Sequence, residues 1–220
     1  MPPKPKITRE MVVDAALAII RRGGVDGVTV RAVAEELGCS TQPVMYHFAT
    51  VEELKRAAYT AADWLHSSYL MQESPDEDPI LSIGLNYIRF AVREPQLFRF
   101  LFQSGYAPER SLAKMIDSPQ LVPIIDAMAQ GAQLTPAQAK EVFLVVALFT
   151  HGYASIIANE SLELDEAVVA AHLTRAFEGA MMAAVAGEYR DATGCGDGYG
   201  YEGQPGDAAA ASPAMEGEHA

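Results

Sequence analysis

Residues Thr29 to Phe48, with the sequence TVRAVAEELGCSTQPVMYHF, decide the fold of this 220-residue chain. Apolar residues recur at helical spacing in the first half, and Gly38 lies where a helix C-terminus favours a left-handed residue. Ser40 is placed to cap a second helix, and Pro43 falls in its first turn, where a missing N–H is tolerated. The stretch therefore predicts two short helices joined by a tight turn, a helix-turn-helix.

The second helix of this pair is predicted to bury Val44 and Phe48 and to turn a polar face outward. The outward side chains are Thr41, Gln42, Tyr46 and His47. Short and medium hydrogen-bonding groups of this kind suit a helix that reaches base edges and phosphates in a major groove. Gln42 is the candidate for base readout, since a glutamine amide can pair bidentately with adenine.

One helix is predicted before this pair and one after it. Thr8 is a plausible cap for a helix that stops at Gly23-Gly24. Thr50, with Glu53 three residues later, forms a capping box that opens a long helix. The N-terminal part is thus three helices around a small core, followed at once by a long connecting helix.

This arrangement resembles the DNA-binding domain of the TetR family of bacterial transcriptional regulators over roughly the first 65 residues. The matching segments are Ala15-Ala16 in the first helix, Gly27 to Ala34 leading into the second, and Gly38-Cys39-Ser40 in the turn. The chain departs from the family at Val44-Met45, where members usually have Leu-Tyr, and at Val51, where they usually have lysine. That tyrosine and lysine commonly contact phosphate in the family, so Tyr46 and Lys55 stand here as substitutes.

The resemblance and the outward polar face together imply a set of DNA contacts. Gln42 is expected to read a base, the other recognition-helix residues to position the helix, and the lysines to add salt-sensitive attraction. The predicted contacts are Lys4, Lys6, Thr29, Arg31, Ser40, Thr41, Gln42, Tyr46, His47 and Lys55.

The charge of the chain is divided unevenly. The whole sequence carries a net charge of −13, which by itself argues against a nucleic-acid partner. Residues 1–60, however, carry 8 Lys and Arg against 7 Asp and Glu, whereas residues 61–220 carry 8 against 22. The near-neutral N-terminal part can approach phosphate, and the acidic remainder is repelled by it, so the N-terminus is expected to face DNA.

The rest of the chain shows helical periodicity and no strand alternation, so the predicted fold is all-α. Cap and proline signals predict helices from Asp78-Pro79 to Glu94-Pro95, from Gln96 to Ser104, from Ser118-Pro119 to Gly131, from Thr135-Pro136 to Glu160, and from Asp165 or Glu166 to Ala186. We expect a helix-turn-helix domain over 1–49, a ligand-binding and dimerisation domain over 50–187, and a disordered tail over 188–220.

The last two long helices carry more apolar surface than one packing face requires. The first has Val142, Val145, Val146, Phe149, Tyr153 and Ile156 around much of its circumference, and the second has small residues at Ala171, Ala176, Gly179, Ala180 and Ala183. In the TetR family the corresponding helices pair with their two-fold mates, which implies a homodimer. A larger monomer core remains the alternative.

Two segments resemble the TetR C-terminal domain type named for its Trp-His-Gly motif. They are Leu148 to Ala154, which contains His151-Gly152 without the tryptophan, and Glu94 to Phe102, a proline followed by aromatic residues. The candidates to line a small-molecule effector cavity are Trp64, Tyr69, Phe98, Phe102, Tyr106, Met115, Phe149 and His151. The alternative for the aromatic residues is plain core, and for His151 a core residue bonded within the protein.

The sequence offers no metal-ligand spacing, disulfide framework, cofactor motif or signal sequence, so we expect no metal, no cofactor and a cytoplasmic location. No apolar run is expected to approach a bilayer-spanning length. The expected function is a ligand-responsive regulator, most simply a repressor, that binds a pseudo-palindromic double-stranded operator as a homodimer. The alternatives are an architectural DNA-binding protein without an effector, and a small enzyme using His151 with Glu160 or Asp165.

Overall fold

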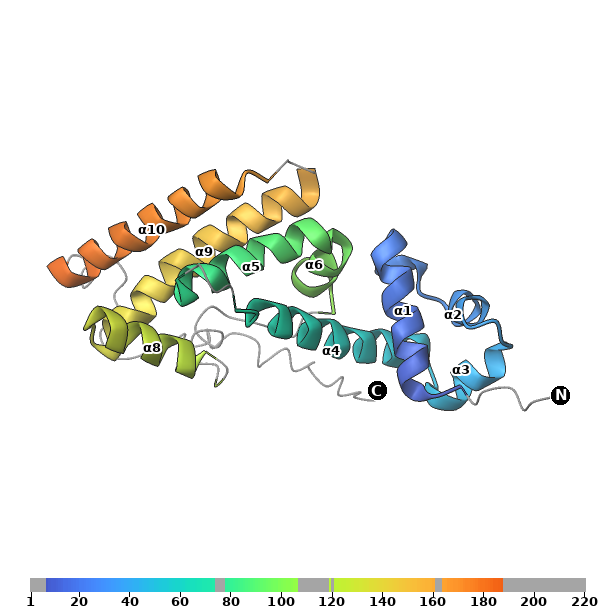
Figure 1. Cartoon of the computed structure of the whole chain (residues 1–220). Helices are drawn as coiled ribbons and strands as arrows, with labels where there is room; N and C mark the ends of the chain where they lie inside the picture. The colour runs from blue at the N-terminus through green and yellow to red at the C-terminus, as the bar shows by residue number, and fades with distance from the viewer. Residues whose placement is uncertain (1–6, 74–77, 107–118, 120, 161–163, 188–220) are drawn as a thin grey trace, which may run out of the picture.

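The computed structural model describes residues 7–73, 78–106, 119, 121–160 and 164–187. Within these ranges every regular element is helical, which confirms the all-α prediction. The elements are α1 (Arg9–Gly23), the 3₁₀ turn η1 (Val25–Gly27), α2 (Val30–Glu36), α3 (Thr41–His47), α4 (Val51–Leu70), α5 (Pro79–Arg93), α6 (Pro95–Phe102), α8 (Val122–Ala132), α9 (Pro136–Glu160) and α10 (Glu166–Ala186). Figure 1 shows α1 to α3 at one end of an elongated molecule, with α4 leading from them to the remaining helices.

Helices α1 and α4 begin at the capping residues that the sequence predicts. The Thr8 hydroxyl accepts a hydrogen bond from the backbone N–H of Met11 at 3.2 Å and opens α1. At the start of α4, Thr50 Oγ1 accepts from Glu53 N at 3.1 Å, and the Glu53 carboxylate accepts from Ala49 N. Each bond satisfies an N–H that has no partner within the helix, so these caps fix where the helices begin.

The later helices start in the same way. Asp78 accepts from two backbone N–H groups at the start of α5, and Asp165 does so at the start of α10. Thr135 and Gln138 form a reciprocal pair at the start of α9, with Gln138 Oε1 accepting from Thr135 N at 2.9 Å and Thr135 Oγ1 accepting from Gln138 N at 3.3 Å. The predicted starts of these three helices are confirmed.

Two predicted boundaries are wrong. α8 begins at Val122, with Pro123 in its first turn, rather than at Ser118-Pro119, and Ser118 lies outside the described residues. α6 begins at Pro95 and ends at Phe102, rather than running from Gln96 to Ser104. A proline is tolerated in any first helical turn, so its presence indicates a nearby helix start without fixing the residue.

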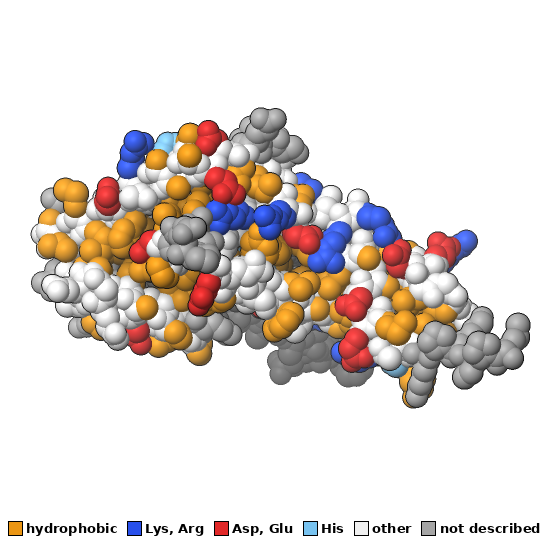
Figure 2. All heavy atoms as spheres, in the orientation of Figure 1, with side chains coloured by type: hydrophobic (Ala, Val, Ile, Leu, Met, Phe, Trp, Pro, Cys, Tyr) orange, Lys and Arg blue, Asp and Glu red, His pale blue; other side chains and the backbone are white. Residues whose placement is uncertain are grey.

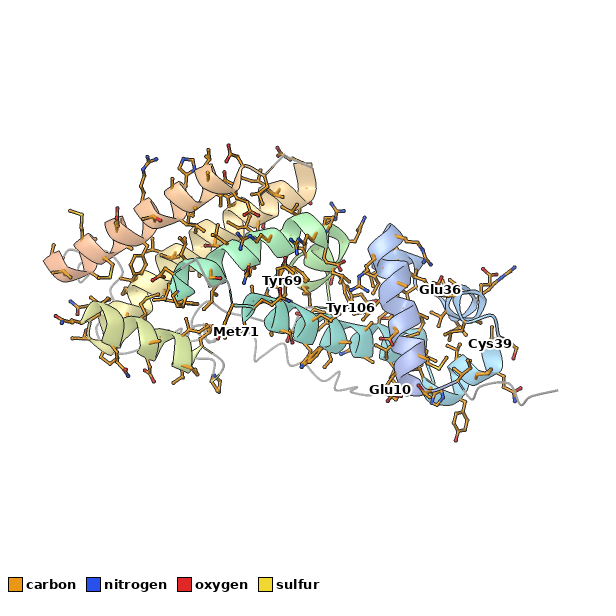
Figure 3. All side chains as sticks on the ribbon, in the orientation of Figure 1. Glu10, Glu36, Cys39, Tyr69, Met71 and Tyr106 are labelled. Atoms are coloured by element: carbon orange, nitrogen blue, oxygen red, sulfur yellow. The ribbon has the colours of Figure 1, made fainter. Side chains whose placement is uncertain are left out.

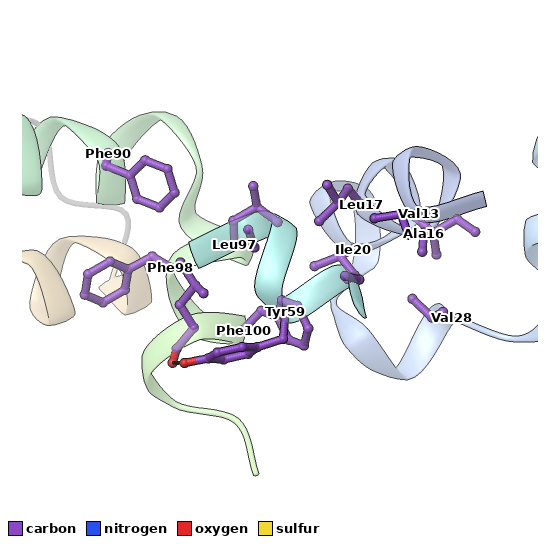
Figure 4. Packing of buried hydrophobic residues seen from close by; sticks show 14 of the residues in the cluster. Val13, Ala16, Leu17, Ile20, Val28, Tyr59, Phe90, Leu97, Phe98 and Phe100 are labelled. Atoms are coloured by element: carbon purple, nitrogen blue, oxygen red, sulfur yellow. Dashed lines mark hydrogen bonds between the residues drawn. The ribbon is translucent and has the colours of Figure 1, made fainter. Parts of the chain in front are cut away.

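A single buried cluster of apolar side chains runs through most of the molecule. It includes Val12 in α1, Phe98 in α6 and Leu173 in α10, and so joins the helix-turn-helix to the C-terminal helices. Figure 4 shows the part of this cluster where α1, α4 and α6 meet, with Ile20, Tyr59 and Phe100 among the side chains drawn. A smaller cluster, which includes Met128 and Val142, joins α8 to α9 and α10.

Helix α9 is long and apolar, and it packs against α5, α8 and α10. By length and composition this helix is apolar enough to cross a membrane, so the expectation that no apolar run approaches a bilayer-spanning length needs correction. The core helix of a soluble protein can have the same length and composition. Only 28% of the most apolar stretch of α9 is buried within the chain, so much of the apolar surface of α9 is left uncovered by its own chain.

Candidate DNA-binding and effector sites

Helix α3 has one buried side and one exposed side. Val44 is buried in it, and Phe48, which follows its last turn, is also buried, as predicted. The exposed side chains are Thr41, Gln42, Met45 and Tyr46. Thr41, Gln42 and Tyr46 therefore lie where the sequence predicts, at a surface that another molecule can reach.

His47 does not turn fully outward, and in this respect the prediction is wrong. Its side chain is half-buried, and its Nε2 lies 2.9 Å from the carbonyl oxygen of Ile7, just before α1. An imidazole N–H that donates to this carbonyl ties the end of α3 to the start of α1. At about 100° per residue, helical spacing places His47 next to Val44 and opposite Gln42 and Met45, so the period could have indicated that it does not point outward, although it cannot reveal a partner 40 residues away.

The turn between α2 and α3 has the predicted backbone. Gly38 has a φ of +60°, in the left-handed region that favours glycine. Ser40 occupies the N-cap position of α3, but its hydroxyl makes no capping hydrogen bond, so only its predicted position is confirmed. Its hydroxyl is exposed beside the outward face of α3.

The remaining predicted DNA contacts differ in how they are held. Thr29 caps α2 by accepting from Ala32 N at 3.1 Å, and Arg31 is exposed and pairs with Glu35 at 3.0 Å. Lys4 and Lys6 lie outside the described residues. An exposed i,i+4 ion pair is weak, so the Arg31 guanidinium can exchange its partner for a phosphate at little cost.

Lys55 is held by its own chain. Its side chain is only 12% exposed, and its Nζ lies 3.6 Å from Glu52 and 5.7 Å above the ring of Tyr106. The Tyr106 hydroxyl donates to the Glu52 carboxylate at 2.9 Å. Burial opposes the charge of Lys55, but bonding to Tyr106 and the charge of Glu52 outweigh it, so the pKa of Lys55 is raised.

Tyr106 lies just beyond α6 and faces α4, as Figure 3 shows. The contact with Glu52 and Lys55 therefore joins the end of α6 to the first turns of α4. The structure places Tyr106 here, with a ring contact to Phe100, rather than beside His151.

Several predicted effector residues come together in one cluster. The ring centroids of Phe98 and Phe102 are 4.8 Å apart, and that of His151 lies 5.5 Å from Phe102. Tyr87, which sequence reasoning missed, brings its hydroxyl to within 2.8 Å of His151 Nδ1. We call Tyr87, Phe98, Phe102, His151 and His66 the aromatic cluster.

His66 is the second residue that sequence reasoning missed. It is buried in α4, and its ring meets Tyr87 and Phe102 edge-on, each with a centroid distance of 5.1 Å. It follows the buried residues Ala58 and Ala62 at four-residue spacing, so the helical period could have indicated its inward position.

The His151 imidazole is bonded on both sides. Nδ1 pairs with the Tyr87 hydroxyl, and Nε2 lies 3.4 Å from the hydroxyl of Ser155. Burial lowers the pKa of His151, so the neutral ring, with one donor and one acceptor, is the favoured form. Glu160 is nine residues further along α9, about 13.5 Å along the helix axis, which is too far to act with His151 as an acid–base pair.

The other effector candidates lie apart from this cluster or at its edge. Trp64 is 67% exposed, and Phe149 is exposed on α9 with its ring 6.0 Å from that of Tyr153. The ring centroid of Tyr69 lies 5.7 Å from that of Phe90, and Phe90 in turn contacts His66 of the cluster. Met115 lies outside the described residues. The structure thus brings together Phe98, Phe102 and His151 and not the whole predicted set.

Helix α6 connects the aromatic cluster to the DNA-binding helices. Glu94, just before α6, pairs with Arg21 of α1 at 3.0 Å. The Tyr59 hydroxyl of α4 donates to the backbone carbonyl of Leu101 at 3.2 Å. The segment of α6 is therefore in direct contact with both α1 and α4.

Comparison with known proteins agrees with this geometry. Residues 12–58 match the family described as bacterial regulatory proteins of the tetR family, and residues 80–183 match the tetracyclin repressor-like C-terminal domain. No curated protein matches the sequence.

Solved structures share the fold. A TetR-family transcriptional regulator from Streptomyces coelicolor is 24% identical, with 84% of this chain and 97% of that chain covered and a TM-score of 0.53. A second S. coelicolor TetR-family regulator is 18% identical, with 83% of each chain covered and a TM-score of 0.60. A putative TetR-family regulator from Vibrio parahaemolyticus is 16% identical, covers 78% of this chain and 97% of its own, and has a TM-score of 0.53.

The chain belongs to the TetR family of DNA-binding transcriptional regulators. Members of this family are regulators and not enzymes, so the alternative of a small enzyme using His151 is discarded. The matched C-terminal family is not described by a Trp-His-Gly motif, and that subtype stays a prediction.

Proposed function

We propose that this regulator binds a pseudo-palindromic operator as a homodimer and acts as a repressor that a small-molecule effector releases from DNA. The observation that carries the proposal is an exposed apolar face on the two longest C-terminal helices. The exposed residues are Leu148, Phe149 and Ile156 on α9, and Val168, Met182 and Val185 on α10. A face of this kind is the usual sign of a protein partner.

The spacing of these residues supports a helical packing surface. Leu148 and Ile156 are eight residues apart on α9, and Val168 and Met182 are fourteen residues apart on α10, so each pair lies on one side of its helix. Figure 1 shows α9 and α10 running side by side at one edge of the molecule, and Figure 2 shows apolar side chains reaching the surface over the C-terminal helices. If these faces of α9 and α10 belonged to the larger core of a monomer, their side chains would be buried within the chain.

A two-fold dimer explains how the DNA surface is used. Two copies related by a two-fold axis present two α3 helices, and the DNA that they bind then has two related half-sites. Within each copy, Gln42 is proposed to read a base, while Thr41, Tyr46 and Arg31 position the helix on the DNA backbone. Lys4, Lys6 and Lys55 are proposed to add salt-sensitive attraction, with the charge of Lys55 partly balanced by Glu52.

The aromatic cluster is the proposed effector site. Its side chains are aromatic, and a polar group of a ligand that takes the place of the Tyr87 or Ser155 hydroxyl would gain a hydrogen bond to the neutral His151 ring. An effector releases DNA only to the extent that it binds the conformation incompatible with DNA more tightly. The cluster includes Phe98 and Phe102 of α6, so a ligand that moves them acts on α1 and α4 through the contacts of Glu94 and Leu101.

Sedimentation of the purified chain at micromolar concentration, alone and with duplexes selected from a random library, tests this function. We expect a dimer in both samples and a selected consensus with two-fold symmetry. A monomer that binds DNA, or a consensus without symmetry, would contradict the proposal.

A further inference from the structure

The exposed face of α3 contains one apolar side chain, Met45. At about 100° per residue, Gln42 and Met45 lie at the middle of this face, and Thr41 and Tyr46 lie on either side of them. The two central residues are three positions apart, so they are neighbours on the helix surface. A helix that lies in the groove on this face brings its central residues nearest to the base edges.

The fold does not account for a methionine at this position. Val44 is the residue of α3 that is buried in the core, whereas Met45 is 44% exposed. A thioether is at most a weak acceptor and has no hydrogen to donate, so Met45 cannot anchor α3 on phosphate as a hydroxyl or a cation does. Its long, flexible apolar side chain fits an apolar partner instead.

The major groove offers one such partner, the C5-methyl group of thymine. We propose that Met45 is a specificity residue that contacts the methyl group of a thymine in each half-site. Residues 42 and 45 are separated by about 4.5 Å along the helix axis, and successive base pairs by about 3.4 Å. The thymine therefore lies within two base pairs of the pair that Gln42 reads. This inference rests on the proposed operator function.

Deoxyuridine substitution tests the contact, because uracil pairs as thymine does but lacks the methyl group. The starting duplex is the consensus that the wild-type protein selects from a random library, and each thymine in the half-sites is replaced by deoxyuridine in turn. At one position, the wild-type protein should bind the uracil duplex about fourfold more weakly per half-site than the thymine duplex. This is the effect of losing about one buried methyl group. The Met45→Ala protein should bind the thymine and uracil duplexes at that position equally.

Two further variants separate this contact from general effects. Met45→Gln keeps the length of the side chain but ends it in an amide, and it should also lose the preference for thymine over uracil. Met71→Ala removes another exposed methionine, at the end of α4, and should keep the wild-type pattern at every position. Because Met45 is exposed, its variants are expected to fold, and circular dichroism of each variant checks this.

The outcomes distinguish this contact from the proposed function. If a symmetric consensus is found but every uracil substitution weakens the wild-type and Met45→Ala proteins equally, Met45 does not read a thymine, while the operator proposal stands. If the library yields no consensus, the operator proposal fails, and the role of Met45 fails with it.

Discussion

Replacement of Gly179 by leucine tests the proposed dimer in a way that separates association from folding. Gly179 is exposed on α10, and a Cβ added there meets nothing within 4 Å in the isolated chain. Leucine is favoured over glycine in a helix interior by about 0.8 kcal/mol. The free energy of unfolding of the monomer should therefore rise slightly in Gly179→Leu rather than fall.

The dimer should respond in the opposite direction. In a two-fold interface each substitution occurs twice, and one overpacked side chain costs about 1–3 kcal/mol. Two copies at a close helix contact then cost about 2–6 kcal/mol, so the dimer dissociation constant should rise by about thirtyfold or more. Sedimentation equilibrium from nanomolar to micromolar concentration measures the constant, and urea unfolding of the dissociated protein measures the stability.

Gly131→Leu on α8 is the matched control. Gly131 is also exposed with nothing within 4 Å of an added Cβ, but it lies outside the face formed by α9 and α10. This variant should dimerise as the wild type does. If Gly179→Leu has the dissociation constant of the wild type, α10 does not pack closely against its mate at this residue and the reasoning is refuted.

Three further outcomes follow from the site. Gln42→Ala should cost about 1–3 kcal/mol of binding at one operator position and relax the preference there, and repeated library selection with unchanged stringency would contradict this role. Phe102→Ala should change the response to an effector in a DNA-release assay while operator affinity without effector stays nearly the same, whereas an equal loss of DNA binding would identify Phe102 as core. Burial lowers the pKa of His151 below the value of 6.5 that an unfolded imidazole has, so protonation favours the unfolded chain. The free energy of unfolding should therefore fall as the pH drops below 6.5. His151→Gln should flatten this part of the stability–pH curve measured by urea unfolding.

Local signals in the sequence predicted local structure well. The caps at Thr8, Thr50 and Asp165 are each decided by hydrogen bonds to residues two or three positions away, so the sequence pattern contains all the information that they need. The burial of Val44 and Phe48 follows from helical spacing in the same way. These features fixed the all-α architecture and the position of the recognition helix.

Contacts between distant segments were beyond the reach of the sequence pattern. The bond of His47 to Ile7 spans 40 residues, and the contact of Tyr106 with Glu52 spans 54. Periodicity shows which side of a helix is buried but not which side chain of another helix it meets. For this reason Tyr87 was missed as the partner of His151, and Trp64 was grouped with aromatic residues that the structure places elsewhere.

The buried cluster that joins α1 to α10 has a thermodynamic consequence. Because side chains from Val12 to Leu173 share one apolar core, neither end of the described chain can lose its packing without exposing apolar surface of the other. Heating should therefore produce one cooperative calorimetric transition, with equal calorimetric and van't Hoff enthalpies when the analysis includes dissociation of the proposed dimer. A molecule that binds at either end then raises the melting temperature of the whole, so a single thermal-shift assay would report on both the proposed operator and the proposed effector.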